Sequence, residues 1–268
     1  AHFRPMGDID LLIPADKGST ITELLFDLGY VNRAPEPAES FETHHHLMPF
    51  YHDQKGVCVE VHTGLFPKRS GLAGPGPFDP QLIQSRLRTI DFRGQPIKAL
   101  TLELQLRHTA CHWAEEFRRI GGILGLLDAS LLLKKANGTI DWDWIFRTST
   151  LAAHVAPLQL LLGYLDKTGV ISLDLETSRT LRRRGKLCPT ALKLQYAILD
   201  QRVLLGKAPG AIMSDANLLS SWKLLLHAGQ SPTVLAKLAW NLVFPADAEN
   251  RYKLEYQLGR LRNLKSRL

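Results

Sequence analysis

Hydrophobic and polar residues alternate in short runs over the first hundred residues of the chain. Alternation with a period of two predicts β-strands, because successive side chains of a strand point to opposite faces of its sheet. Residues 53–56 are turn formers between two such runs, and Gly94 lies inside another, so two antiparallel hairpins are expected. The predicted strand runs are 9–13, 43–52, 57–66 and 89–99.

One segment of this half, residues 19–30, has the period of a helix instead. Thr20 and Glu23 have the spacing of a capping box at its start, and Gly29 is placed to end it. The apolar residues on its predicted inner face are Ile21, Leu24, Leu25 and Leu28. The first hundred residues are therefore expected to combine strands with a helix.

From Thr101 onward the apolar residues follow the helical period, and Asp141 is expected to cap one of the helices. The predicted helical segments are 102–117, 120–131, 138–154, 156–165, 189–205 and 220–228, followed at 251–268 by a basic amphipathic helix or a frayed end. We therefore predict an α+β fold, with an α/β domain at residues 1–100 and an all-helical domain at residues 101–268.

Charge and cysteine content narrow the class of protein. The chain has 268 residues and a net charge of +7, and the basic excess belongs to the part after residue 100. No apolar run reaches the roughly 18 residues that a membrane-spanning helix needs, and the start lacks the pattern of a secretory signal. Cys58, Cys111 and Cys188 have the spacing of neither a disulfide framework nor a zinc site. We expect a soluble, cytoplasmic protein with no membrane partner.

Two carboxylates interrupt the first predicted strand. In an extended chain Asp8 and Asp10 fall on one face, while Ile9, Leu11 and Ile13 point into the core. A pair of aspartates spaced in this way is not specific by itself, since many such pairs only cap strands. Its meaning depends on what lies beside the strand.

The valine-rich run at 57–62 has a similar form. Val59 and Val61 face the core, while Glu60 and His62 point to the other side. If the two strands are neighbours, Glu60 joins the two aspartates, and three carboxylates so close repel one another unless a cation compensates them. Mg²⁺ is the expected ion, because it takes oxygen ligands, leaves room for substrate phosphates and can clamp the oxygens of a phosphoryl transfer.

A set of motifs spread over most of the chain points to one known family. They are RPMGDIDLLIP (4–14), LGY (28–30), VEVH (59–62), LRHTACHWAEEF (106–117), LLDASLLL (126–133) and IDWDWI (140–145). With these motifs the chain resembles the uncharacterised nucleotidyltransferase family of the DNA polymerase β-like superfamily. The resemblance implies a small mixed sheet flanked by helices, with a helical domain forming the other wall of a nucleotide cleft.

The resemblance also implies an activity and its catalytic residues. Asp8 and Asp10 match the metal ligands of the family, and Glu60 matches a third acid that binds metal and activates an incoming hydroxyl. The expected cofactor is Mg²⁺, with Mn²⁺ as the alternative ion. The expected reaction moves a nucleoside monophosphate from a nucleoside triphosphate, ATP in the first instance, to a hydroxyl of a small molecule, protein or RNA, and releases pyrophosphate.

Several basic residues are candidates for binding the substrate. Arg4 lies just before the first strand, where it could hold a phosphate or form a salt bridge with one of the acids. His46 and His62 belong to a histidine-rich region, and imidazoles around a nucleotide cleft donate hydrogen bonds to phosphate. His45 is expected on the opposite face from its neighbours, packed or at the surface.

The helical half contributes two more candidates. His112 and Asp128 fall on consecutive predicted helices, where they either line the cleft or tie the two helices together. Arg118 is a further possible partner of Asp128. The basic run at 179–186 is expected to be a solvated face that could also attract phosphate or RNA.

Two other functions remain open from the sequence. A zinc site built from His44, His46 and His62 with an aspartate would make the protein a metal-dependent hydrolase. Enzymes of the superfamily also carry a helix with a small-residue loop ahead of the strand that holds the aspartates, and here the chain starts only seven residues before Asp8. The chain is therefore expected to be a fragment or to lack that segment, and the alternative to an enzyme is a non-catalytic nucleotide-binding or interaction module.

Overall fold

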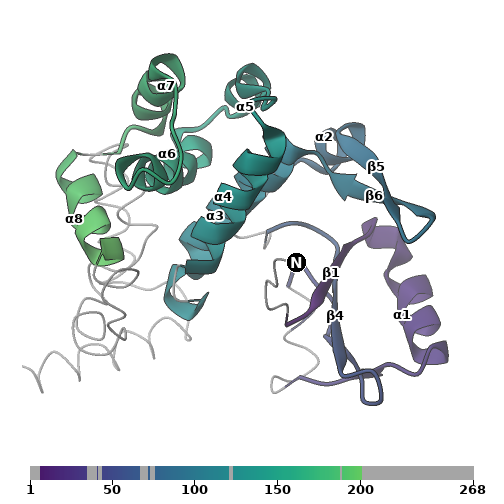
Figure 1. The fold of residues 1–268 in the computed structure, drawn as a ribbon. Helices are drawn as coiled ribbons and strands as arrows, with labels where there is room; N and C mark the ends of the chain where they lie inside the picture. The colour runs from purple at the N-terminus through teal and green to yellow at the C-terminus, as the bar shows by residue number, and fades with distance from the viewer. Residues whose placement is uncertain are drawn as a thin grey trace, which may run out of the picture. The chain divides into compact units, whose positions relative to one another are not determined.

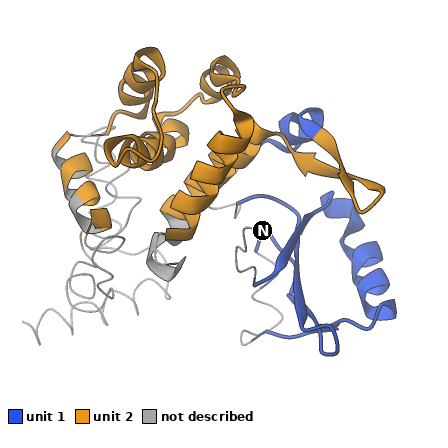
Figure 2. Ribbon diagram, viewed as in Figure 1, with its two compact units in different colours: residues 1–87 blue, residues 88–268 orange. Residues whose placement is uncertain are grey.

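The chain folds into two compact units, residues 1–87 and 88–268 (Figure 2). A computed structural model describes residues 7–34, 41, 44–66, 72, 76–120, 123–187 and 189–200, apart from the side chains of 115–120, 190–191, 194 and 197–198. The division after Leu87 groups the second predicted hairpin with the helices, whereas the predicted domain boundary lies near residue 100.

The first unit is built on a mixed four-stranded sheet (Figure 1). Its strands, in spatial order, are β1 (Ile9–Leu12), β4 (Val57–His62), β3 (Phe50–His52) and β2 (Val31–Asn32). β1 runs parallel to β4, and the other two pairs are antiparallel. Together with the helices of the second unit, this sheet confirms the predicted α+β class and the small mixed sheet.

Helix α1 (Gly18–Asp27) follows β1 after a short 3-10 turn at Ala15–Lys17. The predicted capping box is wrong, because the helix begins at Gly18 without a side-chain cap and Thr20 already lies inside its first turn. The 3-10 turn leads directly into the helix, so no separate capping residue is used. Gly29 ends the helix as predicted, with a φ of +85° that favours glycine.

The core of the first unit lies between α1 and the centre of the sheet (Figure 1). Its buried residues are Leu25, Phe50, Val59 and Val61, with Ile13, Ile21, Tyr30, Leu47 and Val57 packed around them. The alternation of β4 is therefore confirmed. Of the predicted inner face of α1, only Ile21 and Leu25 reach this core, and Leu24 and Leu28 are about half exposed.

The apolar residues of β1 do not enter the core as predicted. Ile9 and Leu11 remain 43% and 41% exposed, and only Ile13, just past the strand, packs on the core. β1 is an edge strand, and the buried side chains of the sheet come from β3 and β4. Alternation indicates which side chains share a face, but it does not indicate how well that face is covered.

The second unit opens with the predicted hairpin, formed by β5 (Leu87–Phe92) and β6 (Gln95–Leu100). Arg93 and Gly94 make its turn with positive φ values. Six helices follow: α3 (Leu102–Ile120), α4 (Ile123–Ala136), α5 (Trp142–Thr148), α6 (Ala152–Lys167), α7 (Leu175–Gly185) and α8 (Pro189–Leu199). None of the helices in the described residues is both long and apolar enough to cross a membrane. The predicted helices at 220–228 and 251–268 lie outside the described residues.

Two local helix starts follow from side-chain capping. Asp141 caps α5 as predicted, since its carboxylate accepts a hydrogen bond from the Trp144 amide at 2.8 Å. Asp79 similarly caps the short helix α2 (Pro80–Ser85) of the first unit, which the sequence analysis did not predict. The aspartate followed by proline was the available signal, because proline is favoured at the first helical position.

Two arginines bind the C-terminal end of α5 to its neighbours. Arg107 of α3 donates to the carbonyl of Ile145, and Arg184 of α7 donates to the carbonyls of Phe146 and Ser149 at 2.6 and 2.9 Å. The last carbonyls of a helix lack partners within the helix, and they carry partial negative charge that a cation stabilises. The Arg107 guanidinium is fully buried, and burial lowers its pKa to about 10.

Candidate functional site

The register of two parallel strands brings two carboxylates together. Asp10 of β1 lies directly beside Glu60 of β4, and Ile9 lies beside Val59. Because the strands are in register, Asp10 and Glu60 share the face of the sheet opposite the valine core. The two strands are therefore neighbours, and both acids lie on an accessible face of the sheet.

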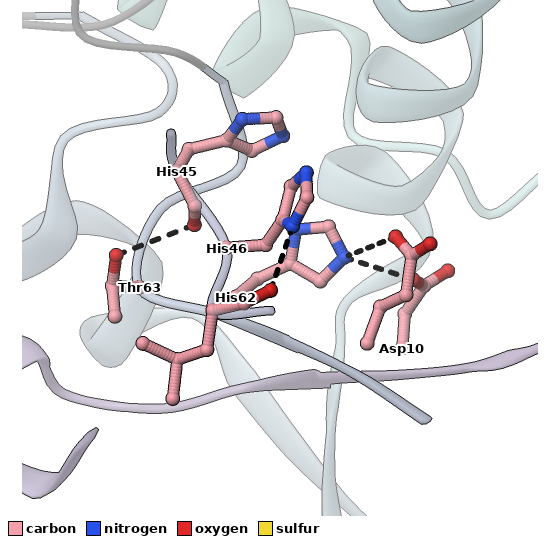
Figure 3. Close-up of polar contacts among 7 residues, drawn as sticks. Asp10, His45, His46, His62 and Thr63 are labelled. Carbon is pink, nitrogen blue, oxygen red and sulfur yellow. Dashed lines mark hydrogen bonds and ion pairs between the residues drawn. The ribbon is translucent and has the colours of Figure 1, made fainter. Parts of the chain in front are cut away.

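His62 connects these two carboxylates. Its Nε2 lies 2.9 Å from Oδ1 of Asp10 and 3.7 Å from Oε2 of Glu60 (Figure 3). The Asp10 side chain is 67% exposed, whereas that of His62 is only 16% exposed. A ring held within the protein thus orients a carboxylate that a solute can reach.

Asp10, Glu60 and His62 have the composition and spacing of a divalent cation site. One potential ligand atom from each lies within 4.8 Å of the others, and within the described ranges no further group of three such side chains comes as close. Two carboxylate oxygens suit Mg²⁺ or Mn²⁺. The imidazole nitrogen binds an ion only without the hydrogen that it donates to Asp10, and in that state it suits Mn²⁺ better than Mg²⁺. The residues present therefore fit the ion that nucleotidyltransferases commonly use.

Asp8 lies near this group without being part of it. It precedes β1 and is exposed. Its charge nevertheless affects the thiol of Cys58 on β4. Burial raises the pKa of this thiol, and the negative charges of Glu60, Asp8 and Asp10 raise the pKa further. All three acids therefore contribute negative potential at the same face of the sheet, which is what attracts a cation.

The histidine-rich segment is not the strand that we predicted. β3 contains only Phe50–His52, and residues 44–47 form an irregular segment alongside the end of β4. The Leu47 amide donates to the carbonyl of Val61, and the amide of Thr63 donates to the carbonyl of His45, both at 2.8 Å. The hydroxyl of Thr63 also donates to the carbonyl of His45, at 3.3 Å (Figure 3). Segment 44–47 is thereby fixed beside the acids.

Three histidine rings gather at this end of β4. The ring centre of His62 lies 5.3 Å from that of His45 and 5.5 Å from that of His46. His46 donates its Nδ1–H to the carbonyl of Leu47 at 2.9 Å, so Nε2 of the neutral ring is an acceptor. The expected separation of His45 from its neighbours is wrong, because strand alternation does not apply to an irregular segment.

This arrangement supports a zinc site of His44, His46 and His62 less than it supports the cation site of Asp10, Glu60 and His62. His44 and His46 have ring centres 5.1 Å apart. Within the described residues, however, neither joins His62 in a group of three ligand atoms close enough to share an ion. The sequence-based prediction of the site did not include His45 or Thr63. For His45, the run of three consecutive histidines was the available signal.

The other predicted substrate residues belong to the second unit or lie outside the described residues. Arg4 falls outside them. His112 is exposed on α3 and Asp128 is half-buried on α4, both in the second unit. The rings of His108 and His112 lie 5.6 Å apart, one helical turn from each other. Their roles in a cleft or in a tie between helices stay predictions.

Comparison with known proteins identifies the family. No match was found among curated proteins or among solved structures. The model of a family described as uncharacterised nucleotidyltransferase matches residues 1–168, which include the carboxylate-bearing sheet and the helices from α1 to α6. This match covers more than half of the chain and agrees with the resemblance that the sequence motifs carry. The chain therefore belongs to this uncharacterised nucleotidyltransferase family.

Proposed function

We propose that the protein transfers a nucleoside monophosphate from a nucleoside triphosphate to a hydroxyl acceptor and releases pyrophosphate. The observation that carries this proposal is the parallel register of Asp10 with Glu60, with His62 donating to Asp10. Family membership supports a nucleotide as substrate. Mg²⁺ or Mn²⁺ is the proposed cofactor, ATP the proposed donor, and the acceptor is a small molecule, a protein or an RNA.

The proposed reaction is an in-line displacement at the α-phosphorus. The acceptor oxygen forms a bond to this phosphorus while the bond from the α-phosphorus to the bridging oxygen breaks, and pyrophosphate leaves. The acceptor proton passes to a carboxylate, for which Glu60 is the candidate, since it is only partly exposed and lies beside Asp10. A bound divalent cation would supply charge neutralisation at the phosphate oxygens.

The chain's own residues have distinct proposed roles. Asp8, Asp10 and Glu60 hold the cation and its bound phosphates, and His62 fixes the orientation of the Asp10 carboxylate. The ring of His46 lies beside that of His62, and in its doubly protonated form it can donate its Nε2–H to a phosphate of the same substrate. Arg4, His112 and Asp128 complete the proposed substrate contacts on the basis of the sequence motifs.

The experiment follows the α-phosphate of ATP. The full chain is incubated with Mg²⁺ or Mn²⁺ and ATP labelled on the α-phosphate or, separately, on the γ-phosphate, with cell-extract fractions as acceptors. Nucleotidyl transfer predicts stable acceptor labelling from α-labelled ATP only. Asp10→Asn and Glu60→Gln should reduce the labelling by at least 100-fold, because each removes a charge from the proposed cation site.

Asp16→Asn is the matched control. It removes a carboxylate from the same unit, at an exposed position where Asp16 pairs only with Lys17 within the described residues. Its labelling should equal that of the parent protein. Labelling from γ-labelled ATP would indicate a kinase. Cation-dependent ATP binding without transfer to any fraction would favour the non-catalytic module, and tight zinc binding lost on changing His44 and His46 would favour the hydrolase.

A further inference from the structure

A cavity of about 530 Å³ opens between α6, α7 and α8 of the second unit. None of the residues proposed for nucleotidyl transfer lines it. Its volume lies within the range of roughly 300 to 1,000 Å³ that is typical of small-molecule sites. The cavity therefore has the size of a small-molecule site, and its lining residues differ from those of the carboxylate-bearing sheet.

Each of the three helices contributes one cation to the lining: Lys167 from α6, Arg182 from α7 and Lys193 from α8. Lys167 forms an ion pair with Asp200 at 2.9 Å. Arg182 donates to the hydroxyl of Ser178, which carries no charge, and Lys193 has no ion pair within the described residues. At least two of the three positive charges are thus available to a ligand.

The single acid of the lining does not compensate these charges fully. Asp166 accepts a hydrogen bond from the amide of Leu173 at 3.0 Å, which directs one of its oxygens to the backbone. Even with Lys167 paired to Asp200, two cations face one acid, so the lining keeps a positive excess. Such a site favours an anion, and most strongly a dianion that two cations can contact together.

Neutral donors lie beside the cations. The hydroxyl of Tyr196 forms no hydrogen bond within the described residues, and a side chain at Gly163 would collide with it. The absence of a side chain at Gly163 therefore gives this hydroxyl its room on α6. Burial raises the pKa of Tyr196 to about 12, so the hydroxyl remains a proton donor at neutral pH. Ser178 supplies a second hydroxyl.

Apart from Gln159, whose Oε1 accepts a hydrogen bond from the amide of Leu187, the rest of the lining is apolar. It consists mainly of Leu173, Leu181, Leu187, Pro189 and Leu192. A bare inorganic anion would leave this surface in contact with water, whereas a ligand with an apolar body would cover it. The lining therefore matches a molecule that has an anionic group at one end and an apolar group at the other.

We propose that the cavity between α6, α7 and α8 binds a small organic phosphate. The phosphate contacts Arg182 and Lys193 and accepts hydrogen bonds from the hydroxyls of Ser178 and Tyr196. The organic part packs on the leucines. A phosphate matches the lining better than a carboxylate does, because it carries up to two charges and three terminal oxygens for these donors.

Phenyl phosphate is a suitable probe, because it joins a phosphate directly to an apolar ring. Titration of the full chain, followed by isothermal calorimetry, should give a Kd on the order of 1 mM, as expected for a ligand of this size. Inorganic phosphate and phenol should each bind at least tenfold more weakly. The double variant Arg182→Gln/Lys193→Gln should weaken phenyl phosphate binding at least tenfold, and Tyr196→Phe should weaken it about threefold.

Arg183→Gln is the matched control. It removes the same charge from α7, but Arg183 does not line the cavity, so binding should be unchanged. Asp10→Asn should also leave it unchanged, which separates this site from the proposed nucleotidyl transfer. Equal losses in Arg183→Gln and in the double variant would overturn the proposal, because they would indicate only the general charge of α7. Unaltered binding in both the double variant and Tyr196→Phe, or no binding to the parent protein, would overturn it as well.

A 5′-phosphorylated oligoribonucleotide distinguishes a pocket from a nucleic-acid surface. The proposal predicts that it does not displace phenyl phosphate at equal concentration. The oligoribonucleotide could instead displace phenyl phosphate, and Arg179→Gln and Arg183→Gln could abolish that displacement. This result would assign the site to the exposed basic face of α7 and would overturn the proposal. Circular dichroism of each variant, compared with the parent protein, establishes that the fold is retained.

Discussion

His62 donates its Nε2–H to the carboxylate of Asp10 across the parallel pair β4 and β1, at 2.9 Å. The backbone of His62 lies beside Leu12, two residues beyond the pairing of Asp10 with Glu60. The hydrogen bond therefore runs diagonally over the face that carries the acids. Since the ring is far less exposed than the carboxylate, we interpret His62 as a positioning residue for Asp10.

The first prediction tests this role by metal affinity. His62→Ala should weaken the binding of Mg²⁺ and of Mn²⁺ by a similar factor, about tenfold to 100-fold, because a carboxylate without its orienting partner must be ordered by the ion itself. His62→Gln, whose amide can still donate to Asp10, should recover part of the loss. Paramagnetic resonance of Mn²⁺, with Mg²⁺ as competitor, measures both affinities.

His52→Ala is the control for this prediction. His52 lies on β3, where its ring packs edge-on against Tyr30 at 5.0 Å and away from the acids. Its replacement should leave both affinities unchanged. A loss of Mn²⁺ affinity alone in His62→Ala would show that His62 is a direct ligand, and unchanged affinity for both ions would contradict any role of His62 at the site.

The side of the sheet that carries the acids could be predicted because it depends on local geometry. Period-two alternation places Glu60 and His62 opposite Val59 and Val61 whatever the strand pairs with. The pairing itself is a long-range property, since about fifty residues separate Asp10 from Glu60 along the chain. Only the family resemblance indicated from the sequence that these two strands are neighbours.

The predictions from the sequence were wrong where the local pattern of residues and the long-range packing differ. Ile9 and Leu11 have the character of core residues, yet β1 lies at the edge and leaves them exposed. His44 and His46 alternate as if in a strand, yet the segment reaches the acids as an irregular chain held by backbone bonds to the end of β4. Neither coverage by other elements nor pairing of an irregular segment is encoded in a short window of sequence.

The second prediction concerns the contact between α3 and α4. A Cβ atom at Gly125 would lie 2.7 and 2.8 Å from Cγ and Cβ of Trp113, which is closer than real contacts allow. Gly125→Ala should therefore destabilise the protein by roughly 1 to 3 kcal/mol, as measured by urea unfolding. Helix propensity alone predicts the opposite effect, a gain in stability of about 1 kcal/mol, because alanine is favoured over glycine inside a helix. A stabilised variant would therefore show that α3 and α4 can move apart at this position. Gln105→Ala, at an exposed position of α3, should change stability by less than about 0.5 kcal/mol.

The third prediction concerns the buried guanidinium of Arg107. Besides the carbonyl of Ile145, it donates to the hydroxyls of Thr148 and Ser149 at 3.0 Å, and it lies 5.0 Å from the ring centre of Trp144. A lysine at 107 would keep the charge without the planar group that makes these contacts. Arg107→Lys should lower the free energy of unfolding by roughly 2 to 4 kcal/mol.

Arg107→Met provides the comparison for this prediction. It fills a similar space without leaving a charge in the interior, so its loss of stability should be smaller than that of Arg107→Lys. The acceptors around it keep other partners, because the hydroxyl of Ser149 donates to the carbonyl of Ile145 at 2.7 Å. Chemical unfolding at neutral pH ranks the two variants, and the reverse order would mean that the lysine ammonium reaches water or a new partner.

The last prediction is a loss of stability in mild acid caused by His154. This residue is buried at the start of α6, its Nδ1 has no hydrogen-bond partner, and burial, with a further contribution from the charge of Arg107, lowers its pKa to about 4. Between about pH 6.5 and pH 4 the unfolded chain therefore binds a proton at His154 that the folded protein does not. The free energy of unfolding should fall over this interval, by up to about 3 kcal/mol. His154→Leu should remove that part of the pH dependence, measured by urea unfolding at several pH values. Val155→Ala, which creates a cavity on the same helix, should lower stability equally at every pH, and an unchanged slope in His154→Leu would show that His154 is not the group that titrates.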